Sequence, residues 1–326
     1  MTTSAPVLVL VGPTAIGKTA LSLSIAAKFG CEIISMDSMQ VYRFMDIGTA
    51  KASREEQAQV RHHLIDIADP DEQYHAASFV RDALAAVQEI RARGKLPLIT
   101  GGTGLYLSAL NKGLFDVVQV PPAVRKRLLD RLELEGRAEL FRELAACDPE
   151  SAARIHPNDT QRLLRGLELH AATGIPWSEH IRRQQAHQLQ SRLHPSLQMQ
   201  LQIGLNCERS LLYERIRQRT EEMMQAPFLR EVEMLLARGY EAALPSMQSL
   251  GYRHMVRHIR GDWDMLTACQ ALVTDTRRYA KRQLTWFRAN DEIHWFDRSQ
   301  TESVFSLIEH FLHHNSVQRP KPMPRH

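Results

Sequence analysis

The strongest chemical signal in the sequence is a glycine-containing segment that matches G-x-x-x-x-G-K-[ST] in full. It follows an apolar run at 7–11 and precedes a helical pattern, which is the context this motif needs. Glycines let such a loop curl so that backbone N–H groups point at phosphate oxygens, and the helix N-terminus adds its positive end. Lys18 supplies a mobile positive charge, and the hydroxyl of Thr19 can bind Mg²⁺ or a phosphate oxygen. The sequence therefore predicts a diphosphate or triphosphate site made by Gly12, Pro13, Thr14, Ala15, Ile16, Gly17, Lys18 and Thr19.

A carboxylate, Asp37, ends the second apolar segment, at 31–37. In open α/β sheets, ligands bind beyond the carboxyl ends of the strands, so Asp37 is expected near the phosphate loop. There it could hold Mg²⁺ or accept a proton. A turn or helix-cap aspartate is the alternative. Asp66, which ends HHLID, could likewise be a Mg²⁺ ligand or a buried residue at the end of a strand.

A second glycine-rich segment, GGTGLY at 101–106, follows the apolar run LPLIT and is expected at the same edge of the sheet. Spacing alone favours an ordinary strand-to-helix turn there. Arg215 and Arg219 lie four residues apart in a predicted helix capped by Asn206, so they share one face. Paired guanidinium groups suit an anionic leaving group. A solvated face that pairs with Glu221 and Glu222 is the alternative.

The clearest nucleic-acid signal is RRYAKRQLTWFR at 277–288, with five basic residues and no acidic one. Helical spacing gathers its basic groups into one stripe, which comprises Arg277, Arg278, Lys281 and Arg282. Basic groups bind phosphates, and the interleaved aromatic residues Tyr279, Trp286 and Phe287 could stack on bases. The alternative is that these aromatic residues belong to the core. Arg162 and Arg165 form a smaller basic edge on another predicted helix.

The elements that must position these residues alternate between strands and helices. Near-continuous apolar runs at 7–12, 31–37, 62–67, 96–102 and 199–205 predict strands buried on both faces, as in a parallel sheet. Helical patterns cover 122–136 and 158–174. We therefore expect an α/β fold with a P-loop NTPase-like parallel sheet flanked by helices. Its parts are a first core segment at 1–117, a helical insertion at 118–197, the rest of the core with C-terminal helices at 198–315, and a disordered basic tail at 316–326.

The composition is that of an ordinary globular protein, with 44% hydrophobic and 24% charged residues and a net charge of +4. The four cysteines are scattered without a C-x-x-C spacing, which argues against a structural zinc site or a disulfide framework. No signal peptide and no apolar run of about 18 residues is found. We expect a cytoplasmic monomer with no membrane segment.

Taken together, these motifs resemble the bacterial tRNA dimethylallyltransferases, also called tRNA isopentenyltransferases or the IPP transferase family. The resemblance extends from Val7 to about Phe296, and the long block DSMQVYRFMDIGTAK at 37–51 is its most specific part. The other blocks, in order, are GPTAIGKT, HHLID, GGTGLY, QRLLRGLE, ERIRQR, LGYR and RRYAKRQLTWFR.

The resemblance implies that the phosphate loop holds the diphosphate of dimethylallyl diphosphate together with Mg²⁺. The acceptor would be N6 of the adenosine 3′-adjacent to the anticodon. By the same resemblance, Asp37 is the general base, Thr19 contacts the diphosphate and its metal, and Arg219 with Arg215 neutralises the diphosphate. The residues expected to contact the tRNA anticodon stem-loop are Asp37, Ser38, Met39, Gln40, Thr103, Arg125, Gln161, Arg162, Leu163, Leu164, Arg165, Gly251, Tyr252, Arg253, Arg277, Arg278, Lys281 and Arg282.

Two positions depart from the family pattern. Phe44 and Pro227 stand where the family usually has glycine, so the local turns could differ. Two other enzyme classes stay open from the residues alone. One is a P-loop kinase of small molecules, and the other is an isopentenyltransferase that acts on free adenine nucleotides. A non-enzymatic RNA-binding module would leave the phosphate loop and Asp37 unexplained.

Overall fold

The computed structural model describes residues 5–112, 120–190 and 194–317. The chain divides into two compact units. Met1–Asn111 and His194–His326 form the first unit, and Lys112–Leu193 forms the second.

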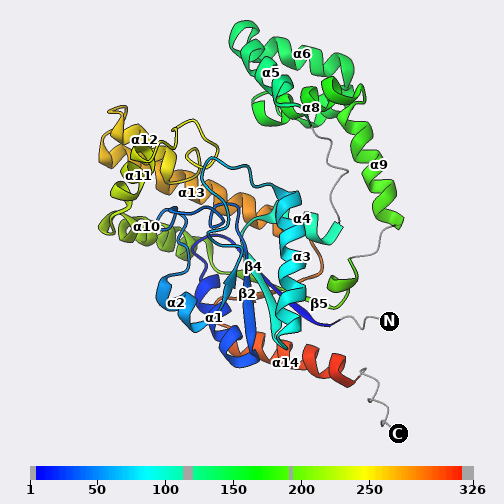
Figure 1. The fold of residues 1–326 in the computed structure, drawn as a ribbon, viewed down its shortest axis with the longest axis vertical. Coiled ribbons are helices and arrows are strands. Elements are labelled where there is room, and N and C mark those ends of the chain that lie inside the picture. The colour runs from blue at the N-terminus through cyan, green and yellow to red at the C-terminus, as the bar shows by residue number, and fades with distance from the viewer. Residues whose placement is uncertain (1–4, 113–119, 191–193, 318–326) are drawn as a thin grey trace. The chain divides into compact units, whose positions relative to one another are not determined.

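A six-stranded parallel sheet is the centre of the first unit (Figure 1). Its order is β3-β2-β4-β1-β5-β6. The strands are β1 (Val7–Val11), β2 (Cys31–Met36), β3 (His62–His63), β4 (Leu96–Gly101), β5 (Gln200–Asn206) and β6 (Ile293–Asp297). The described helices of this unit are α1 (Lys18–Phe29), α2 (Arg54–Gln59), α3 (Ala76–Ala92), α4 (Gly104–Lys112), α10 (Arg209–Gln225), α11 (Phe228–Ala237), α12 (Tyr252–Ile259), α13 (Met265–Arg288) and α14 (Thr301–Val317), with a short 3₁₀ helix, η1 (Pro195–Leu197).

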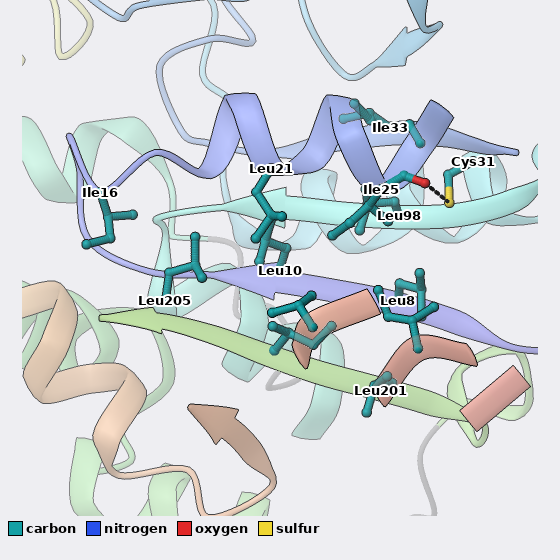
Figure 2. Packing of buried hydrophobic residues seen from close by; sticks show 14 of the residues in the cluster. Leu8, Leu10, Ile16, Leu21, Ile25, Cys31, Ile33, Leu98, Leu201 and Leu205 are labelled. Carbon is teal, nitrogen blue, oxygen red and sulfur yellow. Dashed lines mark hydrogen bonds between the residues drawn. The ribbon is translucent and has the colours of Figure 1, made fainter. Parts of the chain in front are cut away.

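Strand β1 lies inside the sheet, and all five of its residues are buried. This explains its uninterrupted apolar sequence, because such a strand is covered on both faces. Leu8 and Leu10 share a core cluster with Leu21 and Ile25 of helix α1. Figure 2 shows these two helix residues extending toward the sheet, and it also shows the hydrogen bond from the Cys31 thiol to the Ile25 carbonyl.

The register of the sheet brings the predicted site residues together. Val11 at the end of β1 pairs with Gly101 on β4 and with Gly204 on β5, and Met36 on β2 also pairs with Gly101. The carboxyl ends of β1, β2 and β4 are therefore level. Because the phosphate loop, Asp37 and the GGTG turn follow these three strands, they emerge at one edge, as predicted.

The predicted fold class is confirmed, and three local expectations are corrected. The predicted strand at 62–67 is limited to His62 and His63, because Leu64 and Asp66 have left-handed φ angles of 61° and 55° that turn the chain out of the sheet. Helix α10 is capped by Glu208, whose carboxylate accepts from the Leu211 N–H, and not by Asn206, which ends β5. The sixth strand, β6, was not predicted.

The second unit is helical, with α5 (Pro122–Glu135), α6 (Arg137–Cys147), α7 (Pro149–Arg154), α8 (Thr160–Thr173) and α9 (Trp177–Gln190). Its core is a cluster of leucines that includes Leu140, Leu144 and Leu163. The pattern at 158–174 offers Asn158 or Asp159 as the cap of helix α8. The cap is Asp159, which accepts from the Arg162 N–H, and the helix ends at Gly174 in the left-handed conformation.

At the C-terminus, α14 continues to Val317, so Ser316 and Val317 of the predicted disordered tail are helical. The remaining tail, 318–326, lies outside the described residues. In the described part of the chain, no helix combines the length and the hydrophobicity that a transmembrane span needs.

Candidate active site

The phosphate loop connects β1 to α1. Gly17 at the end of the loop has a φ of 111°, a conformation that favours glycine, and Ala15 is also left-handed with a φ of 63°. The ammonium of Lys18 folds back over the loop and donates to the carbonyls of Gly12 (2.9 Å) and Pro13 (2.8 Å). Burial lowers the pKa of Lys18 to about 8, Asp37 acts in the opposite sense, and Arg219 lowers it further.

Two arginines of α10 reach the phosphate loop. Arg219 donates from Nη1 to the Thr14 hydroxyl (3.0 Å), and Arg215 donates from Nε to the Ala15 carbonyl (2.7 Å). In the described parts of the chain, neither guanidinium has a carboxylate within ion-pair distance, and burial lowers the pKa of Arg219. The solvated-face alternative holds instead for Arg217, which is exposed and pairs with Glu214 and Glu221.

The two carboxylate oxygens of Asp37 have different surroundings: one closes a backbone turn, and the other is available to a ligand. Its Oδ1 accepts from the backbone N–H groups of Met39 (2.8 Å) and Gln40 (3.3 Å), which closes the turn after β2. Among the described residues, no donor is bonded to Oδ2. The next residue, Ser38, donates from its N–H to the Thr103 hydroxyl (3.2 Å). This bond links the Asp37 turn to the GGTG turn. The GGTG turn therefore helps to position Asp37 as well as connecting β4 to α4.

Two adjoining cavities open at this edge of the sheet. One has a volume of about 460 Å³ and is lined by Lys18, Thr19, Asp37, Arg215 and Arg219, among others. The other has a volume of about 340 Å³ and is lined by more apolar groups. The two share Thr14, Ala15, Asp37, Thr49, Arg219, Met223 and Tyr279. The predicted cationic groups and the predicted carboxylate therefore lie around one space.

The loop 37–51 is held in place by a carboxylate that no sequence motif indicates. Glu231 on α11 is buried and accepts from the N–H groups of Asp46 (3.1 Å), Ile47 (2.8 Å) and Gly48 (3.2 Å) and from the Tyr252 hydroxyl (2.6 Å). A glutamate among apolar helix residues carries no spacing signal, because it is indistinguishable from an exposed position until the tertiary fold is known.

A buried cation also supports this loop. The side chain of Lys51 is 3% exposed, and its ammonium reaches the carboxylates of Asp46 and Asp66 (2.6 Å each) and the Tyr42 carbonyl (2.8 Å). Asp66, considered above as a possible Mg²⁺ ligand, thus neutralises Lys51. Glu231 and Lys51 together fix the wall that carries Met39, Gln40 and Thr49.

The two departures from the family pattern are accommodated. Phe44 adopts a left-handed φ of 67°, the conformation that a glycine would adopt without cost, and the Arg238 guanidinium lies 4.1 Å from the centre of its ring. Pro227 has a φ of −76° and precedes α11 directly, a position that proline tolerates. Neither residue lines the two cavities.

Comparison with known proteins identifies the protein family of this chain. The family model described as IPP transferase matches residues 40–290. The chain belongs to the IPP transferase family. Its relatives include a tRNA dimethylallyltransferase of Desulfotalea psychrophila, 52% identical over 309 residues, which are 94% of this chain and 96% of that protein. Another, tRNA dimethylallyltransferase 2 of Syntrophus aciditrophicus, is 48% identical over 305 residues, again 94% and 96%.

Solved structures of transferases that act on tRNA resemble this chain over most of its length. The tRNA isopentenylpyrophosphate transferase of Bacillus halodurans has a TM-score of 0.68 and 36% identity, with 95% of this chain and 98% of that chain covered. A eukaryotic dimethylallyltransferase, crystallised in snapshots of its action on tRNA, has a TM-score of 0.75 and 26% identity, with 98% and 82% covered.

Several residues that the family resemblance assigned to tRNA contact are buried in this chain. Tyr252 is 0% exposed and bonded to Glu231, and Gly251 is also buried. Leu163 and Leu164 belong to the leucine core of the second unit. The side chains of Tyr252, Leu163 and Leu164 pack inside the fold, and RNA contact by these four residues stays a prediction. Gln40 is similarly occupied, because its amide donates to the carbonyls of Thr49 and Ala50.

The basic residues of the stripe on α13 differ in their partners: some pair with a carboxylate or lie over an aromatic ring, and others do not. Arg278 pairs with Asp275 (3.2 Å), which also pairs with Arg253 of the neighbouring helix α12 (2.5 Å). Arg277 lies over the ring of Tyr213, and Arg282 lies over the ring of Tyr279. Lys281 is exposed and has no ion-pair partner among the residues described. The aromatic residues divide too: Phe287 is buried, whereas Trp286 is 47% exposed.

In the second unit, the predicted basic edge is organised by a buried carboxylate. Glu168 is 3% exposed and pairs with Arg125 (2.6 Å) and Arg165 (3.6 Å). Arg162 pairs with Asp159 (2.9 Å), and Gln161 is exposed. These contacts hold the guanidinium groups at defined places on the surfaces of α5 and α8.

The donor set of the phosphate loop fits a Mg²⁺ ion that arrives with a diphosphate. No group of three histidine, cysteine or carboxylate side chains that could hold a metal is found in the described residues. A P-loop site does not require one, since phosphate oxygens and water supply most ligands of Mg²⁺. Thr19 and Asp37 line the same cavity and supply hydroxyl and carboxylate oxygens.

Proposed function

We propose that this protein transfers the dimethylallyl group of dimethylallyl diphosphate to N6 of the adenosine 3′-adjacent to the anticodon in tRNA, with release of diphosphate. The observation that carries the proposal is the shared space between the cationic phosphate loop and Asp37. A group-transfer enzyme needs both an anion site for the leaving group and a base for the acceptor. The names of the relatives agree with this reaction.

The donor side stabilises the charge that develops on the diphosphate. As the allylic C–O bond breaks, its electron pair goes to the leaving oxygen. Lys18 and Arg219 lie beside the loop, and preorganised positive groups of this kind are usually the largest catalytic contribution. Arg215 adds a second guanidinium at the loop. Mg²⁺, bound through the Thr19 hydroxyl and diphosphate oxygens, would neutralise further negative charge.

The acceptor is a weakly nucleophilic amine, so the site must remove its proton. N6 forms its new bond to the allylic carbon, and a carboxylate takes the N6 proton as this bond forms. Oδ2 of Asp37 suits this role because Oδ1 is already held by the turn. The more apolar of the two cavities, which Asp37 also lines, suits the hydrocarbon chain and the base.

The tRNA would be held by basic groups on both units. Arg125, Arg162 and Arg165 offer phosphate contacts on the second unit, and Lys281 and Arg282 offer them on α13. An adenosine in a loop leaves its stack at a lower cost than one in a duplex. A free mononucleotide would need no such surfaces, which argues against the mononucleotide class. We expect the protein to act as a monomer.

The test mixes purified protein, Mg²⁺, radiolabelled dimethylallyl diphosphate and unmodified tRNA, and then counts label in the RNA. We expect label in tRNA, a loss of turnover in Asp37→Ala with little loss of tRNA affinity, and full activity in Asp71→Ala, a matched control at an exposed aspartate. Label in free AMP but not in tRNA would favour the mononucleotide class. ATP consumption without any prenyl transfer would favour a kinase.

A further inference from the structure

The side-chain amide of Gln283 joins three elements of the first unit. Its Oε1 accepts from the Thr14 N–H in the phosphate loop (2.9 Å), and its Nε2 donates to the Gly102 carbonyl in the GGTG turn (2.8 Å). Gln283 itself lies on α13 and is 5% exposed. Because both ends of the amide are used in a buried place, the amide has one orientation and holds the three elements in one arrangement.

The glycines of the GGTG turn make this contact possible. A Cβ added at Gly102 would lie 2.2 Å from Nε2 of Gln283, and one added at Gly104 would lie 3.0 Å from Cβ of Trp286. A side chain at Gly102 would therefore displace the Gln283 amide, and one at Gly104 would crowd Trp286 where it leaves α13. The turn is therefore shaped to receive this helix, which gives these two glycines a packing function.

The same helix presents the side chains that are expected to meet RNA. Lys281, Arg282 and Trp286 are exposed within one turn of the buried Gln283. On the inner side, Gly102 precedes Thr103, whose hydroxyl accepts from the Ser38 N–H beside Asp37. A displacement of α13 would thus reach the phosphate loop directly and the Asp37 turn through Thr103.

We propose that Gln283 is a positioning residue that couples RNA binding on α13 to the geometry of the phosphate loop. This inference rests on the proposed function, since it takes tRNA as the ligand of α13. RNA that fixes α13 also fixes Thr14 and Gly102 through one amide. The diphosphate site and the RNA surface then become energetically linked, and each ligand changes the affinity for the other by the same factor.

The test measures this link in binding, apart from transfer. The dissociation constant of an unmodified anticodon stem-loop RNA is measured with and without saturating inorganic diphosphate and Mg²⁺, and the ratio of the two constants reports the coupling. Gln283→Met keeps the length of the side chain but loses both hydrogen bonds. Gln283→Glu keeps an acceptor for Thr14 but places an oxygen against the Gly102 carbonyl. Gln270→Ala, exposed on the same helix, is the matched control.

We expect a ratio clearly different from one in the parent protein and in Gln270→Ala. In Gln283→Met, the ratio should approach one and kcat should fall about tenfold, as loss of buried hydrogen bonds predicts. RNA affinity without diphosphate should change less than about twofold, because no RNA-facing group is removed. If Gln283→Met does not fold, as judged by circular dichroism, Gln283→Glu serves for the same comparison.

A ratio of one in the parent protein, or an unchanged ratio in a folded Gln283 variant, would overturn the inference. Failure of the proposed function has a different signature: the parent protein would transfer no label from dimethylallyl diphosphate to tRNA. Because the coupling ratio needs no transfer, it reports on Gln283 in either case.

Discussion

Arg219 donates a hydrogen bond to the hydroxyl of Thr14 across 3.0 Å, although 205 positions separate the two residues in the chain. One helical turn earlier, Arg215 makes a similar contact to the Ala15 carbonyl. The phosphate loop is therefore completed by a helix from the distant C-terminal part. A loop of this kind supplies N–H groups and one lysine, and under the proposed function these arginines would add positive charge for the diphosphate leaving group.

This relationship predicts the effect of replacing Arg219. We expect Arg219→Ala to lower the single-turnover rate of prenyl transfer by about 100-fold, since one preorganised donor to a developing anion is lost. Arg219→Lys should recover part of the rate, because it keeps the charge but loses the planar fork. Arg217→Ala, on the exposed face of the same helix, is the control. Equal losses at Arg217 and Arg219 would contradict a direct role.

Lys281 should contribute to RNA affinity through phosphate contact. We expect Lys281→Ala to weaken binding of different tRNAs by a similar factor and to reduce the slope of log affinity against log salt by about one. Lys28→Ala is the control, since Lys28 is already paired with Glu309. An affinity that is unchanged at every salt concentration would exclude Lys281 from the interface.

Tyr252 should affect stability rather than RNA binding. Tyr252→Phe removes the hydroxyl that donates to Glu231, and we expect the free energy of unfolding to fall by about 1–2 kcal/mol. Urea unfolding measures this loss, and a filter-binding assay measures tRNA affinity on the same preparation. A lower tRNA affinity at unchanged stability would show that Tyr252 contacts RNA after all.

Glu32 should make stability depend on acid pH. Arg93 donates to both of its carboxylate oxygens (3.0 and 2.8 Å), and His63 lies 2.7 Å from Oε2. The hydrogen bonds from Arg93 lower the pKa of Glu32 from 4.5 to about 2. A pKa depressed in the folded state stabilises the fold above the unfolded pKa, and this stabilisation is lost as the pH falls from about 4.5 to about 2.

The size of this effect can be measured with Glu32→Gln. At pH 7 we expect this substitution to lower the free energy of unfolding by about 3 kcal/mol. Near pH 2 the difference in the free energy of unfolding from the parent protein should largely disappear. Glu309→Gln is the matched control, since its pair with Lys28 is exposed and should contribute less than about 0.5 kcal/mol. A cost that is the same at both pH values would refute the linkage.

The part of the site that was predictable from sequence is the part with local signals. The phosphate loop has a fixed spacing, and Asp37 could be placed by the rule that ligands bind beyond strand ends. The roles of Glu231, Lys51 and Gln283 depend on contacts between segments far apart in the chain. Their residue types are common in exposed helices and loops, so no spacing distinguishes them.

In the fold, too, the elements with a local sequence signal were predictable and the others were not. Strands β1, β2, β4 and β5 are apolar enough to be recognised, whereas β6 contains exposed and charged residues and pairs along one side with β5. The shortened β3 could not be anticipated either, because a left-handed conformation is uncommon for a non-glycine residue and rare for a leucine such as Leu64. The resemblance to a family gave no warning that Tyr252 and Leu163 are buried, since a motif does not distinguish contact from support.

The strand order also determines when, during synthesis on the ribosome, this enzyme can become active. Strand β1 is made first, yet one of its edges pairs with β5, whose residues begin only at Gln200. Until then, an apolar edge has no partner and is a target for chaperones. Arg219 and Gln283 follow later still. A nascent chain therefore holds its phosphate loop long before these two side chains exist, so the complete arrangement around the loop forms only after α13 has been made.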